Sequence, residues 1–261
     1  MEQNFTNNIK NIKPKKHLGQ NFLVDKNILQ KIINSADIKS DDIILEVGPG
    51  TGILTKELAK KAKKIIAVEK DKSIIEVLKE NLKDFQNIEI INEDILKFNL
   101  KEKKYKVIAN IPYYLTSALI RKFLEEKNQP KELILMIQKE VAQRICETPP
   151  NMSLLSVSVQ FYADAKILFN VSKNSFWPVP KVDSAVIKIV PRGLTSPDLF
   201  FRIVKAGFSH PRKQLAGNLS KELKIKKAKI KKLLLQNNIK PTQRAETLYI
   251  EDWKNLTKTI K

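Results

Sequence analysis

Residues 43–58 combine an apolar run, a glycine-rich turn and a helix-like run, in that order. The apolar run, I-I-L, predicts a buried strand, and E-V-G-P-G-T-G at 46–52 follows it directly. Glycine lets the backbone turn sharply and approach a ligand closely, because it has no Cβ. A second apolar run, 65–68, ends in Glu69, which lies 21 residues after Gly48. An acid about 20 residues beyond such a turn is placed to bind a ribose hydroxyl pair. The pattern therefore predicts a nucleoside-binding crevice.

The spacing of the glycines separates several kinds of nucleotide site. A dinucleotide fingerprint is G-x-G-x-x-G, whereas this turn reads G-x-G-x-G and has Ile53 where the third glycine would stand. A P-loop is excluded, because no Gly-Lys-Ser/Thr follows. The E-x-G-x-G-x-G pattern resembles the first motif of S-adenosylmethionine-dependent methyltransferases. The alternative, a structural turn in another α/β protein, is disfavoured by the placement of Glu69.

The charge balance indicates a polyanionic partner. The 261 residues include 48 Lys+Arg against 28 Asp+Glu, a formal net charge of +20. Nucleic acid is the commonest partner of so basic a chain. A lysine-rich genome also raises the lysine count, but it does not explain why acidic residues fail to balance it. The length suits one good-sized domain and a small one.

Cysteine, histidine and hydropathy patterns argue against several classes of protein. Cys146 is the only cysteine, so no intrachain disulfide is possible, and we expect a core residue rather than a nucleophile. Two separate histidines, His17 and His210, cannot build a metal site with it. Residues 1–20 lack the apolar stretch of a signal peptide, and no apolar run approaches the ~18 residues of a membrane span. We expect a cytoplasmic protein.

Strand-like and helix-like runs alternate from about residue 40 to about residue 140. After the first two strands, further strands are predicted at 88–91, 106–109 and 133–137, and helices at 72–83, 116–126 and 139–146, with Asp71 as an N-cap. Such alternation predicts a parallel sheet with helices on both faces. Ligands bind such sheets at the carboxyl ends of the strands. Gly48, Glu69, Asp94 and Asn110 follow or end four successive strands, so we expect them at one edge.

The remaining chain predicts a second, smaller domain. Residues 165–172 and 182–190 read as an antiparallel pair of strands, and proline and glycine at 191–193 then mark a boundary. We expect a catalytic, cofactor-binding domain of residues 1–192 and a basic helical domain of residues 193–261.

The C-terminal region is the more basic part of the chain. Residues 193–261 contain 16 Lys+Arg against 5 Asp+Glu, and residues 221–232 alone contain seven lysines and one glutamate. Leu219, Leu223 and Ile230, with Leu234, predict one face of a single amphipathic basic helix. The lysine cluster favours a surface that contacts phosphates, and the alternative is a solvated helix face.

The sequence Asn110-Ile111-Pro112-Tyr113 ends the fourth predicted strand and suits methylation of an exocyclic base amine. Such a nitrogen is a poor nucleophile, because its lone pair is conjugated to the ring. A side-chain carbonyl and a backbone carbonyl can accept its hydrogen bonds, and Tyr113 offers a flat face on which the base can stack. A methyl sulfonium is already activated, so the protein mainly supplies position and electrostatics.

Six motifs, in order, resemble those of the ribosomal RNA adenine N6-dimethyltransferase family over nearly the whole chain. They are K-H-L-G-Q-N-F-L (16–23), E-V-G-P-G-T-G (46–52), V-E-K-D (68–71), E-D-I-L (93–96), N-I-P-Y (110–113) and F-W-P-V-P-K-V-D-S-A-V (176–186). The K-V-D-S-A-V run and P-x-x-R-A-E-x-L at 241–248 most resemble the small-subunit (16S) enzymes. The resemblance implies a Rossmann-like methyltransferase fold with a small C-terminal helical domain.

The resemblance also implies the cofactor S-adenosylmethionine and roles for particular residues. Cofactor contacts fall on Asn21, Leu23, Gly48, Glu69, Asp94 and Asn110. Among them, Glu69 holds the ribose hydroxyls and Asp94 takes the adenine amine. Catalytic contacts fall on Asn110, Tyr113 and Phe176. Asn110 orients the target amine, Tyr113 stacks on the target base and Phe176 clamps its other face, while Trp177 is expected in the core. The base is extruded from its loop to reach the site.

The implied function is dimethylation of two neighbouring adenines of small-subunit rRNA in the pre-30S ribosomal particle, by an enzyme expected to be a monomer. Residues 148–157 depart from the family, because Tyr-Gly-Arg is missing before Leu-Ser-Val, and an RNA or cofactor contact is in doubt there. Arg212, Lys213 and Arg244 are candidates for the RNA binding. Three alternatives are an antibiotic-resistance methyltransferase of large-subunit rRNA, a non-catalytic RNA-binding assembly or transcription factor, and a DNA adenine methyltransferase. The last would more often carry Pro-Pro-Tyr/Trp at the strand end.

Overall fold

The computed structural model describes residues 14–15, 18–193 and 198–260, so Lys16 and His17 of the first motif lie outside the described residues. The chain forms two compact units. One contains residues 1–142 and 166–191, and the other contains residues 143–165 and 192–261.

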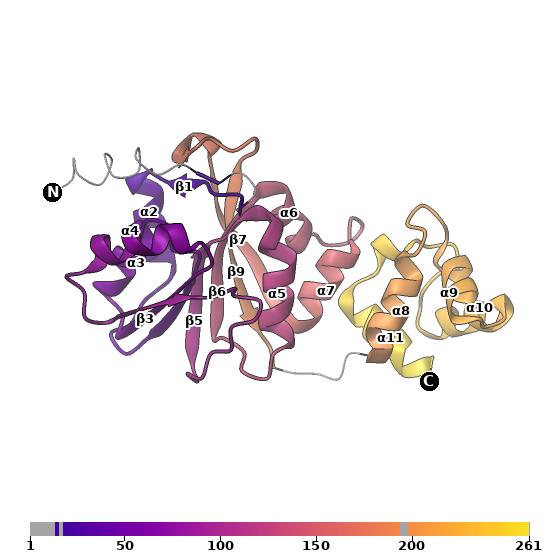
Figure 1. The fold of residues 1–261 in the computed structure, drawn as a ribbon. Helices are drawn as coiled ribbons and strands as arrows, with labels where there is room; N and C mark the ends of the chain where they lie inside the picture. The colour runs from indigo at the N-terminus through magenta and orange to yellow at the C-terminus, as the bar shows by residue number, and fades with distance from the viewer. Residues whose placement is uncertain (1–13, 16–17, 194–197, 261) are drawn as a thin grey trace. The chain divides into compact units, whose positions relative to one another are not determined.

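The first unit is built on a sheet that has seven strands among the described residues (Figure 1). Five strands, β2 to β6, run parallel, and β9 pairs with β6 in the antiparallel direction. In spatial order the strands are β4 (Ile88–Asn92), β3 (Lys64–Glu69), β2 (Ile43–Val47), β5 (Tyr105–Asn110), β6 (Glu132–Gln138), β9 (Ser184–Pro191) and β7 (Ala163–Val171). The predicted α/β fold is confirmed, and the two strands predicted after residue 160 are neighbours.

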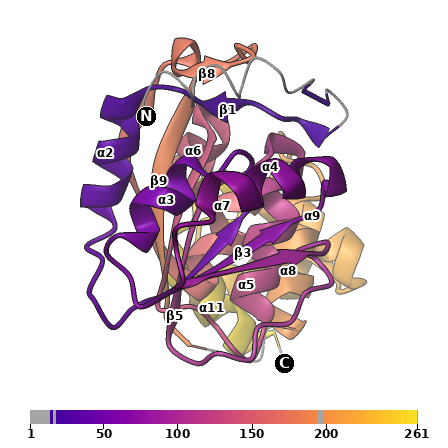
Figure 2. The ribbon, with the colours of Figure 1, turned by 60° about the vertical axis from the view of Figure 1, so that its left-hand side comes forward.

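The central strands are apolar along their length because helices cover both faces of the sheet. In β2, β3, β5 and β6 nearly every residue is buried, whereas the edge strand β4 is half-exposed. The helices α2, α3 and α4 lie on one face, and α5 and α6 lie on the other (Figures 1 and 2). Their bounds are α2 (Lys26–Ser35), α3 (Ile53–Ala59), α4 (Lys72–Leu82), α5 (Thr116–Glu125) and α6 (Lys139–Cys146).

Two aspartates are the N-caps of helices in the first unit. Asp25 accepts hydrogen bonds from the backbone N–H groups of Asn27 and Ile28, at 2.9 and 3.2 Å, and starts α2. Asp71 accepts from the Ser73 N–H at 3.0 Å and starts α4, as its position in the sequence predicted. Each side chain satisfies N–H groups that have no partner within the helix.

A short antiparallel pair, β1 (Phe22–Leu23) and β8 (Phe176–Trp177), joins the beginning of the first unit to its end. Opposite residues of such a pair point to the same face of the ladder. Leu23 pairs with Phe176, and both belong to the buried cluster between α2, α3 and the sheet. Residues far apart in sequence are thereby held together, and a hydrogen bond from Ser175 to Asp25, 150 positions away, supports the same junction at 3.0 Å.

The second unit is helical. Its indole at Trp253 is fully buried and stacks on Phe208 with ring centroids 5.7 Å apart. Gly207 allows this packing, because a Cβ there would lie 2.4 Å from the Trp253 ring.

The helices of the second unit are α7 (Leu154–Tyr162), α8 (Asp198–Phe208), α9 (Leu215–Leu223), α10 (Lys227–Gln236) and α11 (Ile250–Thr259). Short 3-10 turns are η2 (Tyr113–Leu115) and η3 (Lys173–Ser175) in the first unit and η4 (Ala245–Thr247) in the second. No helix within the described ranges is long and apolar enough to cross a membrane.

The division between the units differs from the predicted boundary after residue 192. Residues 143–165 pack with the C-terminal helices rather than with the sheet domain. Phe161 of α7 stacks on Phe200 of α8 with ring centroids 4.0 Å apart, and the Met152 N–H donates to the Glu246 carbonyl at 3.0 Å. These contacts join residues far apart in sequence, so the local composition at 191–193 did not reveal them.

The single basic helix predicted over 221–232 is two helices. α9 ends at Leu223, and Lys224 adopts a left-handed conformation with φ 56°. The Ile225 N–H donates to the Ser220 carbonyl at 3.2 Å, and the Ser220 hydroxyl donates to the Ile225 carbonyl at 2.7 Å, which closes the turn. Of the predicted apolar face, Leu223 is half-buried, whereas the other three residues, Leu219, Ile230 and Leu234, are fully buried. The predicted apolar face therefore exists, but it is shared by two helices and the turn between them.

Candidate functional site

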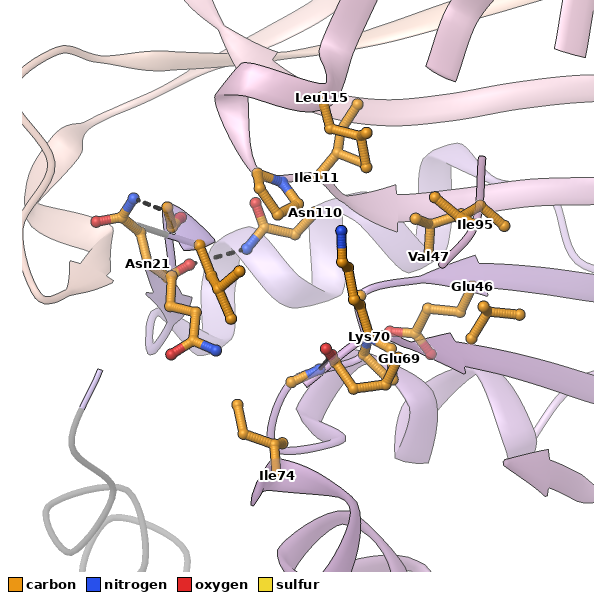
Figure 3. Close-up of a pocket in the computed structure, with 18 of the residues that line it drawn as sticks. Asn21, Glu46, Val47, Glu69, Lys70, Ile74, Ile95, Asn110, Ile111 and Leu115 are labelled. Carbon is orange, nitrogen blue, oxygen red and sulfur yellow. Dashed lines mark hydrogen bonds between the residues drawn. The ribbon is translucent and has the colours of Figure 1, made fainter. Parts of the chain in front are cut away.

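The carboxyl ends of β2, β3, β4 and β5 meet at a pocket in the first unit (Figure 3). The side chains of Asn110 and Asn21 lie on one side of it, and those of Glu46 and Glu69 lie on the other. The pocket is lined by seven of the residues predicted for the site: Asn21, Leu23, Gly48, Glu69, Asp94, Asn110 and Tyr113. Phe176 is the one predicted site residue that does not line it.

The glycine turn lines the pocket through residues 48–51. Gly48, Gly50 and Gly52 have φ values of 65°, 57° and 85°, a region that residues with a Cβ rarely adopt. A Cβ at Gly50 would lie 3.0 Å from the Phe22 ring, and one at Gly52 would lie 2.9 Å from the Leu78 side chain. The turn therefore needs glycine both for its conformation and for close packing.

Glu69 ends β3 with its carboxylate held in place by backbone N–H groups. The Asp71 N–H donates to Oε1 at 2.8 Å, and the Gly50 N–H lies 3.4 Å from Oε2. The residue is only 8% exposed, and burial raises the pKa of its carboxyl. A fixed carboxylate of this kind can accept two hydrogen bonds from a vicinal diol.

Asp94 follows β4 and is partly engaged. The Leu96 N–H donates to Oδ1 at 3.0 Å, and Lys70 Nζ forms an ion pair with Oδ2 at 2.8 Å. The Lys70 hydrogen bond, together with that from Leu96, lowers the pKa of Asp94. Lys70 also lines the pocket, and its side chain extends into it (Figure 3). Sequence reasoning gave Lys70 no role, although it stands next to Glu69 in the V-E-K-D motif.

The Asn110 side chain is oriented by the N-terminal part of the chain. Its Nδ2 donates to the Asn21 carbonyl at 3.1 Å, and the Asn21 side chain donates in turn to the Gly19 carbonyl at 3.1 Å (Figure 3). The side-chain carbonyl oxygen of Asn110 has no hydrogen-bond partner within the described part of the chain, so it remains an acceptor at the end of β5. An incoming amine donates hydrogen bonds, so it needs an acceptor of this kind.

Residues 18–23, which we call the N-terminal segment, line the pocket and are tied down at Asp71. Lys15 Nζ and Gln20 Nε2 donate to the two oxygens of Asp71, at 2.7 and 2.8 Å. Burial opposes ionisation, but the hydrogen bonds from Lys15, Ser73 and Gln20 prevail and lower the pKa of Asp71 to about 2. One carboxylate therefore both starts α4 and anchors the segment that carries Asn21.

The predicted positions of Phe176 and Trp177 are corrected by the structure. Phe176 is 2% exposed and belongs to the hydrophobic core, whereas Trp177, expected in the core, is half-buried and stacks on Phe22. The register of β1 with β8 explains this, because Phe176 lies opposite the buried Leu23 and points the same way. The pairing is non-local, so the sequence order alone did not reveal it.

A sequence profile described as ribosomal RNA adenine dimethylase matches residues 11–259. The chain belongs to this family. It is 43% identical over 256 residues to the ribosomal RNA small subunit methyltransferase A of Dehalococcoides mccartyi, covering 94% of this chain and 88% of that protein. The protein of the same name from Alkaliphilus oremlandii is 45% identical over 254 residues, covering 91% and 88%. The family expected from the motifs is confirmed.

Solved structures of methyltransferases share the fold. A dimethyladenosine transferase from Plasmodium falciparum superposes with a TM-score of 0.78 at 30% identity, covering 90% of this chain and 95% of that one. The 23S rRNA methyltransferase ErmE superposes with a TM-score of 0.77 at 26% identity, covering 92% and 99%. The methyl donor of the family, S-adenosylmethionine, is the cofactor that the glycine turn predicted.

Glu46, the first residue of the E-V-G-P-G-T-G motif, also lines the pocket, although the sequence predicted no role for it. It is 1% exposed, and its Oε2 has no hydrogen-bond partner among the described residues. Burial, with a smaller contribution from the nearby Glu69, raises the pKa of Glu46 to about 8. A buried acceptor without a partner is costly unless a ligand completes it. S-adenosylmethionine carries two positive charges, a sulfonium and an ammonium, so the site fits that cofactor.

Proposed function

We propose that this protein dimethylates N6 of two adjacent adenines in small-subunit (16S) rRNA during ribosome assembly. The observation that carries the proposal is the amide of Asn110, which lines the pocket together with the glycine turn and is oriented by its hydrogen bond to the Asn21 carbonyl. Membership of the ribosomal RNA adenine dimethylase family supports the reaction. The two relatives named above, at 43% and 45% identity, support the small-subunit substrate.

Six residues would hold the cofactor. Glu69 would take the ribose hydroxyls, Asp94 would take the adenine amine, and Gly48 would let the backbone approach closely. Asn21 and Leu23 would contact the cofactor from the N-terminal segment, and Asn110 would contact it from the end of β5. When bound, S-adenosylmethionine supplies a methyl group that is already activated on a sulfonium.

The remaining catalytic work is positioning. The Asn110 carbonyl oxygen and a neighbouring backbone carbonyl accept hydrogen bonds from the target amine, which holds the nitrogen and favours a more tetrahedral geometry. Tyr113 stacks on the base. Burial raises the pKa of the Tyr113 phenol, so the hydroxyl stays neutral and works as a hydrogen-bonding group. Oriented groups of this kind contribute by fixing the reactants close together.

The C-terminal unit supplies an RNA-binding surface in this proposal. All seven lysines between residues 221 and 232 are exposed, whereas Ile230 is fully buried and Leu223 and Ile225 are half-buried. Exposed lysines at this density attract the phosphate backbone without reading sequence. We place the lysine-rich turn of α9 and α10 against rRNA, with Arg212, Lys213 and Arg244 as further contacts.

The proposal also covers the oligomeric state of the enzyme, the particle on which it acts and its location. The enzyme acts as a monomer on the pre-30S particle in the cytoplasm. A large-subunit rRNA substrate, as in the antibiotic-resistance enzymes, is the main alternative, and the lower identity of 26% to the 23S rRNA methyltransferase ErmE disfavours it.

Tritiated methyl transfer tests the substrate directly. Small subunits from a strain that lacks this modification, and naked large-subunit RNA in parallel, are incubated with the protein and labelled S-adenosylmethionine. We expect N6,N6-dimethyladenosine in the small subunits alone. Label in the large-subunit RNA alone favours the resistance enzyme, and no label in either RNA favours the non-catalytic assembly factor.

A further inference from the structure

The Tyr113 ring is fixed at both ends, and the second attachment comes from a distant strand. At one end the backbone is constrained by Pro112 and by η2, which begins at Tyr113. At the other end the phenolic oxygen lies 2.8 Å from the hydroxyl oxygen of Ser184. Ser184 is fully buried, and it stands 71 residues along the chain from Tyr113.

Ser184 is itself held firmly, because it begins β9. It pairs with Gln138, the last residue of β6. The adjoining Asp183 accepts a hydrogen bond from the Lys139 N–H through its carbonyl and another from the Lys173 N–H through its side chain, both at 3.0 Å. The hydroxyl that meets Tyr113 therefore belongs to the first residue of an internal strand of the sheet rather than to a loop. By contrast, the adjacent Tyr114 is 60% exposed.

We propose that Ser184 is a positioning residue for methyl transfer, whose hydroxyl holds the Tyr113 phenol and so fixes the plane on which the target adenine stacks. The inference rests on the proposed function, because it needs a base on Tyr113. A flat ring anchored only at Cβ can rotate about two side-chain bonds. Fixing its far end limits that rotation, and a group supported by such a neighbour keeps productive geometry better than a free one.

The hydrogen bond between Ser184 and Tyr113 acts on the bound base rather than on the cofactor. Ser184 is not among the residues that line the pocket, whereas Tyr113 lines it. Losing the hydroxyl should therefore lower kcat, while the affinity for S-adenosylmethionine stays within about twofold. A role in general stability would not separate these two quantities.

A double-mutant cycle tests the proposal. Ser184→Ala, Tyr113→Phe and the double variant are compared with the wild type for methyl transfer to small subunits and for cofactor binding by calorimetry. We expect each single variant to lose about tenfold in kcat, since small misplacements of reactants are costly. The double variant should lose no more than either single one, because both remove the same hydrogen bond.

Multiplicative losses in the double variant, or an unchanged kcat in Ser184→Ala, would overturn the proposal. Ser156→Ala is the matched control, since Ser156 is equally buried but belongs to the second unit and should leave kcat unchanged. If Ser184→Ala does not fold, Tyr113→Phe tests the proposal by itself, because it removes the same hydrogen bond from the other side. An unchanged kcat in Tyr113→Phe would show that this hydrogen bond does not contribute to methyl transfer. A wild type that does not methylate small subunits refutes the proposed function, whereas an active wild type with independent losses refutes only the Ser184 assignment.

Discussion

Replacing Glu46 with glutamine should stabilise the cofactor-free protein, and the gain should grow with pH. The carboxyl of Glu46 is buried beside Glu69, and its pKa is raised from 4.5 to about 8. Below pH 4.5 it is protonated in both the folded and the unfolded chain, so it adds nothing to the pH dependence. As the pH rises, the unfolded carboxyl ionises first, and stability is lost until the folded carboxyl ionises near pH 8.

The size of the effect follows from the two pKa values. Each pH unit between them is worth about 1.4 kcal/mol, so the loss between pH 5 and pH 8 is on the order of 3 kcal/mol. Glu46→Gln removes the ionisation and with it this loss. Carboxyl groups away from Glu46 titrate equally in both proteins, so their contributions cancel in the difference, and only the smaller coupling to Glu69 is lost with the Glu46 charge.

Urea unfolding of wild type and variant at pH 5, 6, 7 and 8 measures that difference. The gap in unfolding free energy should widen steadily with pH, whatever constant offset the new amide introduces. Glu80→Gln is the control, because that side chain is 68% exposed and forms an ion pair with Lys83 at the surface. Parallel pH curves for wild type and Glu46→Gln would show that the Glu46 carboxyl is not held neutral by burial.

Three further substitutions address the cofactor, the target base and the RNA. Asn110→Ala should keep cofactor affinity within several-fold while nearly abolishing methyl transfer, and retained turnover would remove Asn110 from the reaction. Glu69→Ala should weaken S-adenosylmethionine binding at least tenfold by calorimetry, because a charge-assisted contact to the ribose is lost; unchanged affinity contradicts the ribose assignment. Changing Lys224, Lys227 and Lys231 to glutamine should weaken RNA binding and flatten its salt dependence. An equal effect from three exposed lysines neutralised in the first unit would make the contribution nonspecific.

Local patterns predicted the sheet domain well, because its elements are defined by neighbours in sequence. The apolar runs placed the strands within about two residues, and Asp71 marked the start of α4. Since β2 to β6 are parallel, the end of each of these strands also placed Gly48, Glu69 and Asn110 at one end of the sheet. Glu46 was overlooked because its burial depends on packing that a short motif does not describe.

The errors arose where distant segments decide the structure. Phe176 was assigned to the pocket because nothing in its neighbourhood shows that β8 pairs with β1. The turn at Lys224 was missed because a lysine, unlike a glycine, gives no sign of a left-handed conformation. In each case the deciding contacts come from residues that the local pattern does not include.

The interleaved order of the two units has a consequence for how this enzyme can be cut or recombined. The chain passes from one unit to the other three times, after residues 142, 165 and 191. A truncation after Pro191 would remove Phe200 and leave Phe161 without its stacking partner. A single protease nick at that point should instead give two fragments that stay associated. Exchange of the C-terminal region between relatives should yield a folded hybrid only when the internal stretch 143–165 travels with it.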